Sequence, residues 1–269
     1  MFLVLTGLSA LPAFACDLRT EGRPADVAGY VEAAEACLRA PPDGFSFDGD
    51  LEAGFFRLVN DERRAAGLAP VRMRHELRAA AQFHSLDMAA GGFFGHQGPD
   101  GRDGVYRIAA LDRTALADFS AENVATVSKG SGRIDPDFAL KRLHRNLMDS
   151  PGHRANILHP KATDAAFGVV RTRGGVWVTQ LFLGLSGTLP EAAPLRLSGA
   201  SRLRAPRGLE GWEFVRFDLV TEDGAAAPAI ALPPLSGDAR LAAYATQPGD
   251  DPRAFYWIRF LGPAVTVTP

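Results

Sequence analysis

Hydrophobic residues recur at helical spacing through the first half of the chain. Three such stretches are bounded by capping residues or proline, and a fourth ends at a proline pair. The predicted helices cover residues 25–40, 50–66, 74–90 and 136–150. Asp50 and Asp135 are the expected N-caps of the second and fourth, because a short polar side chain there accepts a free backbone N–H. Gly67 is expected to end the second helix in a left-handed conformation.

After residue 161 the apolar positions alternate with period two, as in strands with one buried face. Residues 166–171 and 176–183 are predicted to pair as a hairpin around the turn at 173–175. Shorter alternating runs follow at residues 214–220, 229–232, 241–245, 255–260 and 264–267. Helices followed by strands favour an α+β layered domain. Residues 190–269 are expected to form a small β-rich module, which is either separate or packed on the main domain as extra strands.

The composition is that of an ordinary globular protein. Of the 269 residues, 46% are hydrophobic and 22% are charged, which argues against wholesale disorder. The formal net charge is −2, so no basic field exists to attract nucleic acid or anionic lipid.

The amino terminus indicates export. Residues 1–15 form an apolar run that is too short to span a bilayer, which needs about 20 residues. The run ends in the small-x-small pattern Ala13-Phe14-Ala15, which is typical of a signal-peptidase site. We therefore predict a signal peptide at 1–15, a secreted or periplasmic location and no transmembrane span. A buried first strand or helix is the alternative.

Cys16 and Cys37 are the two cysteines of the chain. In an exported protein their simplest use is one disulfide, which would contribute roughly 3 kcal/mol by loop-closure arguments. Two alternatives remain. Cys16 directly follows the cleavage pattern, where a lipoprotein anchor would be attached, and both cysteines could be buried free thiols.

Three polar residues are candidates for chemistry. His96 lies in a turn-rich segment after the glycine pair that ends a helix, Glu122 follows a loop, and His153 lies two residues after Pro151. Brought together, they would suit zinc or another divalent metal at an open site, or an acid/base pair working near neutrality. Each could instead have a structural role. His84 falls on the apolar side of its helix and is interpreted as a core residue.

Four short motifs occur in a characteristic order along the chain. They are FFGH at 93–96, AEN at 121–123, SPGHRANIL at 150–158 and VWVTQLF at 176–182. Together they resemble the CAP superfamily of secreted proteins (cysteine-rich secretory proteins, antigen 5 and pathogenesis-related proteins), in its bacterial form. The resemblance implies a three-layer α-β-α sandwich over residues 51–187, preceded by a helical segment and linker at 16–50.

The same resemblance implies a large cleft lined by two histidines and two acidic residues. Matched position by position, His96 and Glu122 are retained, whereas the other two positions fall on Ser150 and Trp177. The bacterial motif supplies His153, which we infer takes over one cleft position. His96, Glu122 and His153 are therefore the predicted metal ligands and the candidate catalytic residues.

Three kinds of function are compatible with the sequence. The first is a binding or interaction module for an extracytoplasmic ligand, lipid or protein, or for a metal. The second is a hydrolase of peptide or cell-wall material, with a histidine as base, Glu122 orienting it, and water or Ser150 as nucleophile. Neither a Gly-x-Ser-x-Gly elbow nor a His-Glu-x-x-His motif supports it. The third is a purely structural role, in which alanine would be tolerated at all three positions.

Overall fold

The computed structural model describes residues 16, 18, 26–130, 132–199, 201–221, 224–229, 237–251 and 253–268. The predicted signal peptide at 1–15 lies outside these residues. Within them, no helix is long and apolar enough to cross a membrane.

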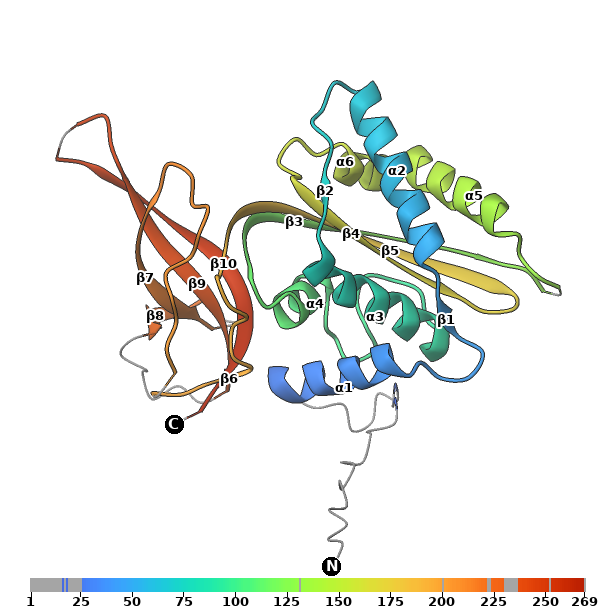
Figure 1. Ribbon diagram of the computed structural model, residues 1–269, viewed down its shortest axis with the longest axis horizontal. Helices are drawn as coiled ribbons and strands as arrows, with labels where there is room; N and C mark the ends of the chain where they lie inside the picture. Colours follow the sequence, from blue (N-terminus) through green and yellow to red (C-terminus); the bar gives the residue numbers. More distant parts are fainter. Residues whose placement is uncertain are drawn as a thin grey trace, which may run out of the picture.

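Three long antiparallel strands form the middle of the molecule (Figure 1). They are β3 (Ala115–Ser128), β4 (Asp164–Arg171) and β5 (Gly175–Thr188). The predicted hairpin is the β4–β5 pair, and β5 lies between β4 and β3. Two short strands, β1 (Ser46–Phe47) and β2 (Arg72–Met73), both pair with β4.

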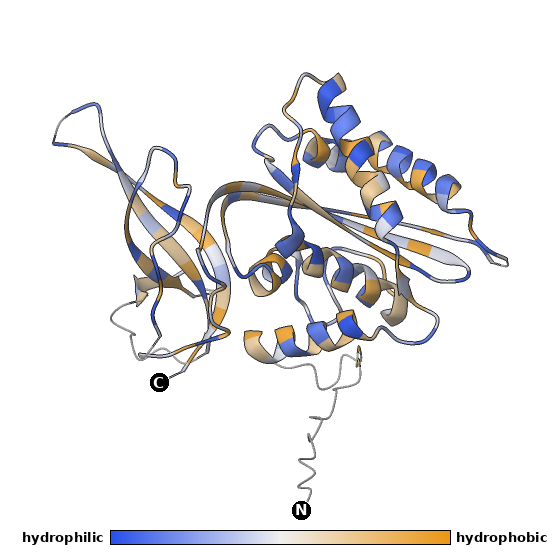
Figure 2. Ribbon diagram, in the orientation of Figure 1, coloured by the Kyte–Doolittle hydropathy of each residue, from blue (hydrophilic) through white to orange (hydrophobic). Residues whose placement is uncertain are grey.

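Helices cover both faces of these strands, which gives the predicted three layers (Figure 1). One face carries α1 (Val27–Arg39), α3 (His75–Gly91) and α4 (Gly104–Leu111). The opposite face carries α2 (Gly49–Ala65), α5 (Pro136–Asp149) and α6 (Pro151–Ile157). The alternation of β5 divides the core accordingly, since Leu181 and Leu183 pack with the first set of helices and Phe182 packs with the second. The hydropathy colouring shows apolar and polar positions on different sides of the same helices (Figure 2).

The helix boundaries follow local capping chemistry, with one correction. The N-cap of α2 is Asp48, whose side chain accepts the N–H of Leu51 at 2.9 Å, so the prediction of Asp50 is wrong. Asp50 lies in the first turn, where a negative charge still favours the helix dipole. Asp135 caps α5 as predicted, and Gly67 follows α2 with a φ of 73°.

The contact between α3 and β4 requires a glycine. A Cβ on Gly168 would lie 2.1 Å from the backbone carbonyl carbon of Ala81, which no side chain can occupy. The backbone of the helix therefore lies directly against the strand at this point.

The C-terminal strands continue the same sheet instead of forming a detached one. They are β6 (Arg196–Leu197), β7 (Glu213–Val220), β8 (Ala226–Pro228), β9 (Gly237–Pro248) and β10 (Phe255–Val267). The strand order is β1-β4-β5-β3-β10-β9-β7-β8, with β2 on β4 and β6 on β10. Two predicted runs, 255–260 and 264–267, are one strand with an irregularity between Leu261 and Ala264. Most of the predicted strand at 229–232 lies outside the described residues. Because the sheet is continuous, the proposed division at 187–190 stays a prediction.

The two ends of the described chain meet. Cys16 and Cys37 form the predicted disulfide, which ties the start of the chain to α1. Asp238 of β9 accepts the N–H of Val27 at 3.1 Å and the hydroxyl of Thr266 in β10 at 2.9 Å. The first helix is thus attached to the last two strands.

Candidate functional site

The candidate site lies along one side of β3. Strand β5 pairs with β3 along its whole length, whereas β10 pairs with it at Ala117, near its beginning. The far side of β3 at Glu122 is consequently approached by other elements. The segment between α3 and α4 brings His96, and α6 brings His153.

His96 and Glu122 are hydrogen-bonded. The Nδ1 atom of His96 lies 2.9 Å from Oε1 of Glu122, and the imidazole is 56% exposed while the carboxylate is 8% exposed. The hydrogen bond to Glu122 raises the pKa of His96 above its ordinary value. Burial alone would raise the pKa of Glu122, but the hydrogen bond from His96 and the charge of Arg107 hold that pKa below its usual range. Glu122 is therefore ionised at neutral pH.

Arg107 holds the other side of the carboxylate. Its buried guanidinium donates to Oε2 of Glu122 at 2.7 Å and to the backbone carbonyl of His96 at 2.7 Å. One arginine thus fixes both members of the pair. Gly104, at the start of α4, allows this helix to approach, because a Cβ there would lie 2.9 Å from the same carboxylate oxygen.

Sequence reasoning missed α4, and Arg107 with it. Asp103 and Gly104 are a recognisable helix start, and Asp103 caps α4 by accepting the N–H of Tyr106. A pattern search that accepted short helices would have found α4. It would not have shown that Arg107 reaches a carboxylate 15 positions away.

His84 is a core residue, as predicted, and it also borders the site. It is fully buried on α3, and its Nε2 lies 2.9 Å from the carbonyl of Gly95 and 3.8 Å from Oε1 of Glu122. Burial, together with the charge of Arg107, lowers the pKa of His84 to about 4. His84 therefore remains neutral beside the carboxylate.

His153 completes the predicted group. Its ring centroid lies 6.3 Å from that of His96, and its pKa is lowered by burial and by the neighbouring His96. His153 lies in α6, which begins at Pro151, as helices often do because proline suits the first helical position. The structure thus brings together all three predicted residues.

A chain of amides links the three motifs behind the site. The side-chain amide of Asn123 donates to the carbonyl of His153 at 3.0 Å and to Gln180 at 3.2 Å. The amide of Asn156 donates to Asn123 at 2.9 Å and to the carbonyl of Glu122 at 3.3 Å. These bonds fix α6 against β3 and so determine where His153 lies.

The two remaining family positions, Ser150 and Trp177, make no side-chain hydrogen bond or ion pair with the three site residues in the part of the chain that the structure describes. Ser150 lies between α5 and α6 and makes no side-chain capping bond. Trp177 pairs with Thr126, four residues along β5 from Leu181, the partner of Glu122. At roughly 3.3 Å per residue that is about 13 Å along the strand.

The arrangement fits a metal only in part. Both oxygens of Glu122 are engaged, one by His96 and one by Arg107. Among the residues that the structure describes, no group of three or more His, Cys, Asp or Glu side chains is arranged to hold a metal ion. The two imidazoles are better placed, because a carboxylate on Nδ1 is the usual way of orienting a ligating histidine. The zinc site formed by His96, Glu122 and His153 stays a prediction.

Comparison with known proteins agrees with this fold and these motifs. The family described as "CAP: Cysteine-rich secretory protein family" matches residues 56–182. The Bacillus subtilis protein YkwD, described as uncharacterized, is 33% identical over 130 residues, covering 47% of this chain and 44% of YkwD. Residues 56–182 thus form a CAP domain of the bacterial type.

Solved structures give two further similarities. An outer surface protein from Borrelia burgdorferi is 15% identical, with a TM-score of 0.42, covering 51% of this chain and 96% of that one. An extracellular SCP-domain protein from Bacillus anthracis is 21% identical, with a TM-score of 0.42, covering 51% of this chain and 41% of that one. The match to YkwD and the match to the Bacillus anthracis protein each span less than half of the other protein's length.

Proposed function

We propose that this protein is an extracytoplasmic CAP-type binding protein that receives a ligand at His96 and His153. One observation carries the proposal: Glu122 is ionised, hydrogen-bonded to His96 and paired with Arg107. A carboxylate held in this way orients an imidazole and is poorly available as a general base. What the site offers to a ligand is therefore the pair of imidazoles.

The disulfide supports an extracytoplasmic location. Structural disulfides persist in oxidising compartments and are rare where thioredoxin and glutathione keep thiols reduced. Cys16 and Cys37 are joined, which is consistent with export and leaves no thiol on Cys16 for a lipid anchor in this form.

Zinc is the probe that tests the imidazole pair. We expect zinc to bind the chain in calorimetry and binding to be lost in the His96→Ala/His153→Ala double variant. His75→Ala, which removes an exposed imidazole at the start of α3, is the matched control and should bind like the wild type. Unchanged zinc binding by a folded double variant would place the metal elsewhere and contradict the proposal. Absence of binding to the wild type would remove metal as the ligand class.

A hydrolase is the second candidate, and one observation favours it. The pKa of His96 is raised and that of His153 is lowered, although the rings are neighbours. Pairs of groups whose pKa values are pushed apart are typical of an acid and a base acting together. In that mechanism neutral His153 would take a proton from water, and His96 would donate one to the leaving group.

Turnover separates the two candidates. Peptide or cell-wall hydrolysis with a bell-shaped pH profile, in which each limb is lost in one single-histidine variant, would establish catalysis. Ligand binding without turnover in the same preparations supports the binding protein.

A further inference from the structure

A cavity of about 130 Å³ lies where the C-terminal strands meet the layered part of the molecule. Its walls come from α4, β3 and β5 on one side and from β9 and β10 on the other. The lining residues used below are Val105, Ala109, Ala117, Leu183, Arg240 and Leu261. Neither part of the molecule forms this cavity alone, since Arg240 and Leu261 lie outside the segment matched by the CAP family.

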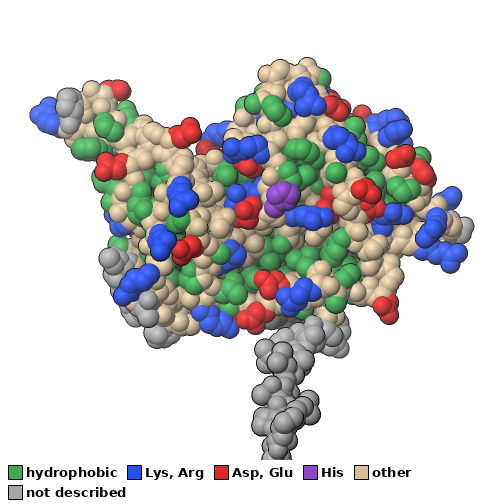
Figure 3. All heavy atoms as spheres, in the orientation of Figure 1, with side chains coloured by type: hydrophobic (Ala, Val, Ile, Leu, Met, Phe, Trp, Pro, Cys, Tyr) green, Lys and Arg blue, Asp and Glu red, His purple; other side chains and the backbone are tan. Residues whose placement is uncertain are grey.

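The walls are mainly apolar. Leu183 and Ala109 are buried at its base, and Val105 and Leu261 are 45% and 37% exposed. The space-filling view shows hydrophobic side chains at the surface among charged ones in the middle of the face that it presents (Figure 3). An engineered apolar cavity of about 150 Å³ accepts a benzene ring, so an apolar group of about six non-hydrogen atoms suits this one.

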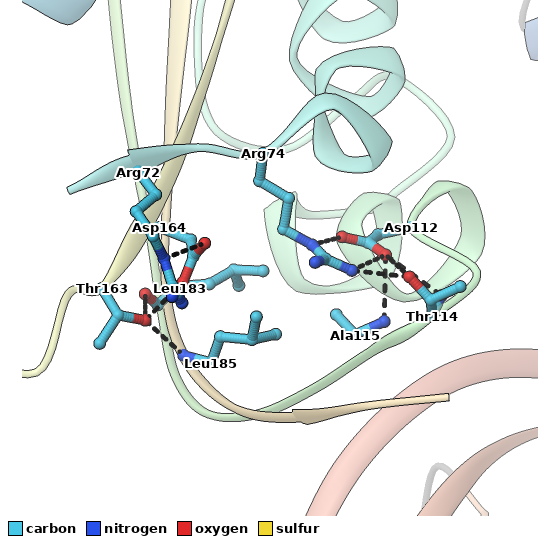
Figure 4. A network of polar contacts seen from close by, with 9 residues as sticks. All are labelled: Arg72, Arg74, Asp112, Thr114, Ala115, Thr163, Asp164, Leu183 and Leu185. Carbon is cyan, nitrogen blue, oxygen red and sulfur yellow. Dashed lines mark hydrogen bonds and ion pairs between the residues drawn. The ribbon is translucent and has the colours of Figure 1, made fainter. Parts of the chain in front are cut away.

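The two acidic residues in the lining are already neutralised. Asp112 is buried and pairs with Arg74, whose Nη2 lies 2.8 Å from Oδ1, and it also accepts the backbone N–H groups of Thr114 and Ala115 (Figure 4). Asp118 pairs with Lys161 at 3.1 Å. Neither acid therefore supplies an uncompensated negative charge to the cavity.

Arg240 differs from them. Its Nε and Nη2 donate to the carbonyl of Gly262 at 3.3 and 3.2 Å, and among the described residues no carboxylate lies within ion-pair distance of it. Burial lowers the pKa of Arg240, and the more distant charge of Asp103 opposes this only in part. A partly buried cation without a counter-ion is costly, so an anion beside it would be stabilised.

We propose that this cavity binds an apolar carboxylate, with the apolar group between α4 and β10 and the carboxylate on Arg240. The acid could be a free organic acid or the C-terminus of a peptide with an apolar last residue. The proposal does not rest on the proposed function, because none of its residues belongs to the histidine pair. The sites are nevertheless neighbours, since Ser120 of the lining lies two residues before Glu122 on β3, about 7 Å along the strand.

Phenylacetate and its neutral counterpart phenylacetamide test the proposal in calorimetry or NMR titrations of the full chain. We expect the acid to bind at least about tenfold more tightly than the amide, as a charge-assisted contact should. Arg240→Gln should abolish that preference and Arg240→Lys should retain part of it. Ala117→Leu should weaken binding of both compounds by filling the cavity. Arg253→Gln, at an arginine whose side chain is 91% exposed on the β9–β10 connection, is the matched control and should leave binding unchanged.

Peptides distinguish the two sources of the acid. N-acetyl-Ala-Leu and its C-terminal amide are titrated in parallel, and tighter binding of the peptide acid than of phenylacetate identifies a peptide C-terminus. Tighter binding of phenylacetate identifies a free acid. If Arg240→Gln does not fold, Arg240→Lys and Ala117→Leu carry the test. Equal binding of acid and amide, no binding of either, or unchanged acid preference in a folded Arg240→Gln would overturn the proposal.

Discussion

The layered part of the molecule and the C-terminal strands use charged residues differently. In the layered part both faces of the sheet are covered, and several charged side chains are buried and bonded to fixed partners. In the C-terminal strands one face packs into a core and the other presents charged and aromatic side chains to solvent. Charges hold elements in place in the first region and form a surface in the second.

One arginine from each region shows the contrast. Arg63 is 1% exposed and donates to the backbone carbonyls of Ile157, His159 and Ala162, so it fastens α2 to the segment after α6. Arg216, in β7, lies 4.1 Å over the ring of Tyr244, with its side chain partly in solvent. Removing the first takes the donor from several buried backbone carbonyls of other elements, whereas removing the second leaves the buried Asp218 still paired with Arg259.

Arg63→Ala should have the largest effect, lowering the free energy of unfolding by about 3–5 kcal/mol, because buried carbonyls lose their donors. Arg64→Ala is the matched control. Its side chain is 57% exposed and pairs with Asp61 on the surface, so the change should cost about 0.5 kcal/mol. Denaturant unfolding of both variants measures the difference. Equal losses of unfolding free energy in the two variants would show that the buried arginine contributes no more to stability than the exposed one.

The Cys16→Ser/Cys37→Ser variant should lose about 3 kcal/mol, since the unfolded chain gains the freedom of a loop of 21 residues. The comparison is made by denaturant unfolding beside wild type in reductant, which should match the variant. A loss below about 1 kcal/mol, well under the usual range for a disulfide, would mean that packing of α1 alone holds the amino-terminal segment.

Acid should weaken the layered part through His84. Its pKa is about 4 when folded and ordinary when unfolded, so the unfolded state binds the proton first. His84 therefore leaves the free energy of unfolding unchanged above about pH 6.5. As the pH falls toward 4, it lowers that free energy by up to roughly 3 kcal/mol. His84→Gln should reduce the stability difference between neutral pH and a pH just above that folded pKa. An identical pH dependence in variant and wild type would exclude His84 as its source.

The aromatic surface of the C-terminal strands should tolerate substitution. Trp257 is 53% exposed and stacks on Tyr244 with ring centroids 5.0 Å apart. Trp257→Ala should lower the free energy of unfolding by about 1 kcal/mol or less, the usual value of one aromatic pair. Phe260→Ala, at a buried position on the same strand, should cost about 3 kcal/mol or more. Similar losses of unfolding free energy in the two variants would contradict the division of the C-terminal strands into a buried face and an exposed face.

NMR titration gives the smallest and most specific signal. His96 should titrate above its ordinary pKa and His153 below it, and Glu122→Gln should lower the pKa of His96. The contribution of the His96–Glu122 bond to stability is present below about pH 6.5 and is lost as the pH rises through the raised pKa. If Glu122→Gln leaves the pKa of His96 unchanged, the two side chains are not hydrogen-bonded in solution.

Sequence reasoning succeeded where a local signal was complete. The caps of α5 and the end of α2, the β4–β5 hairpin and the pairing of the two cysteines are all present as predicted. It missed β3, although Asp118, Ser120 and Glu122 alternate there with Phe119 and Ala121 in the period of two that is typical of a strand. These polar positions lie where β3 approaches the site.

The candidate site was predictable only through motif order. Nothing in the spacing of His96, Glu122 and His153 shows that they converge, since long-range packing of β3, α4 and α6 brings them together. The role of Arg107 could not be predicted from the sequence for the same reason. Its role depends on a partner that belongs to another element.

The attachment of α1 to β9 and β10 affects the order in which the chain can fold. The bond between Val27 and Asp238 joins residues 211 positions apart. Because synthesis begins at the amino terminus, α1 is made long before β9 and β10. Until those strands are made, the apolar side of this helix lacks some of the residues on which it packs. Contacts this distant in sequence slow folding and lengthen the exposure of apolar surface. The newly made chain therefore leaves part of the apolar side of α1 uncovered until β9 and β10 have been synthesised.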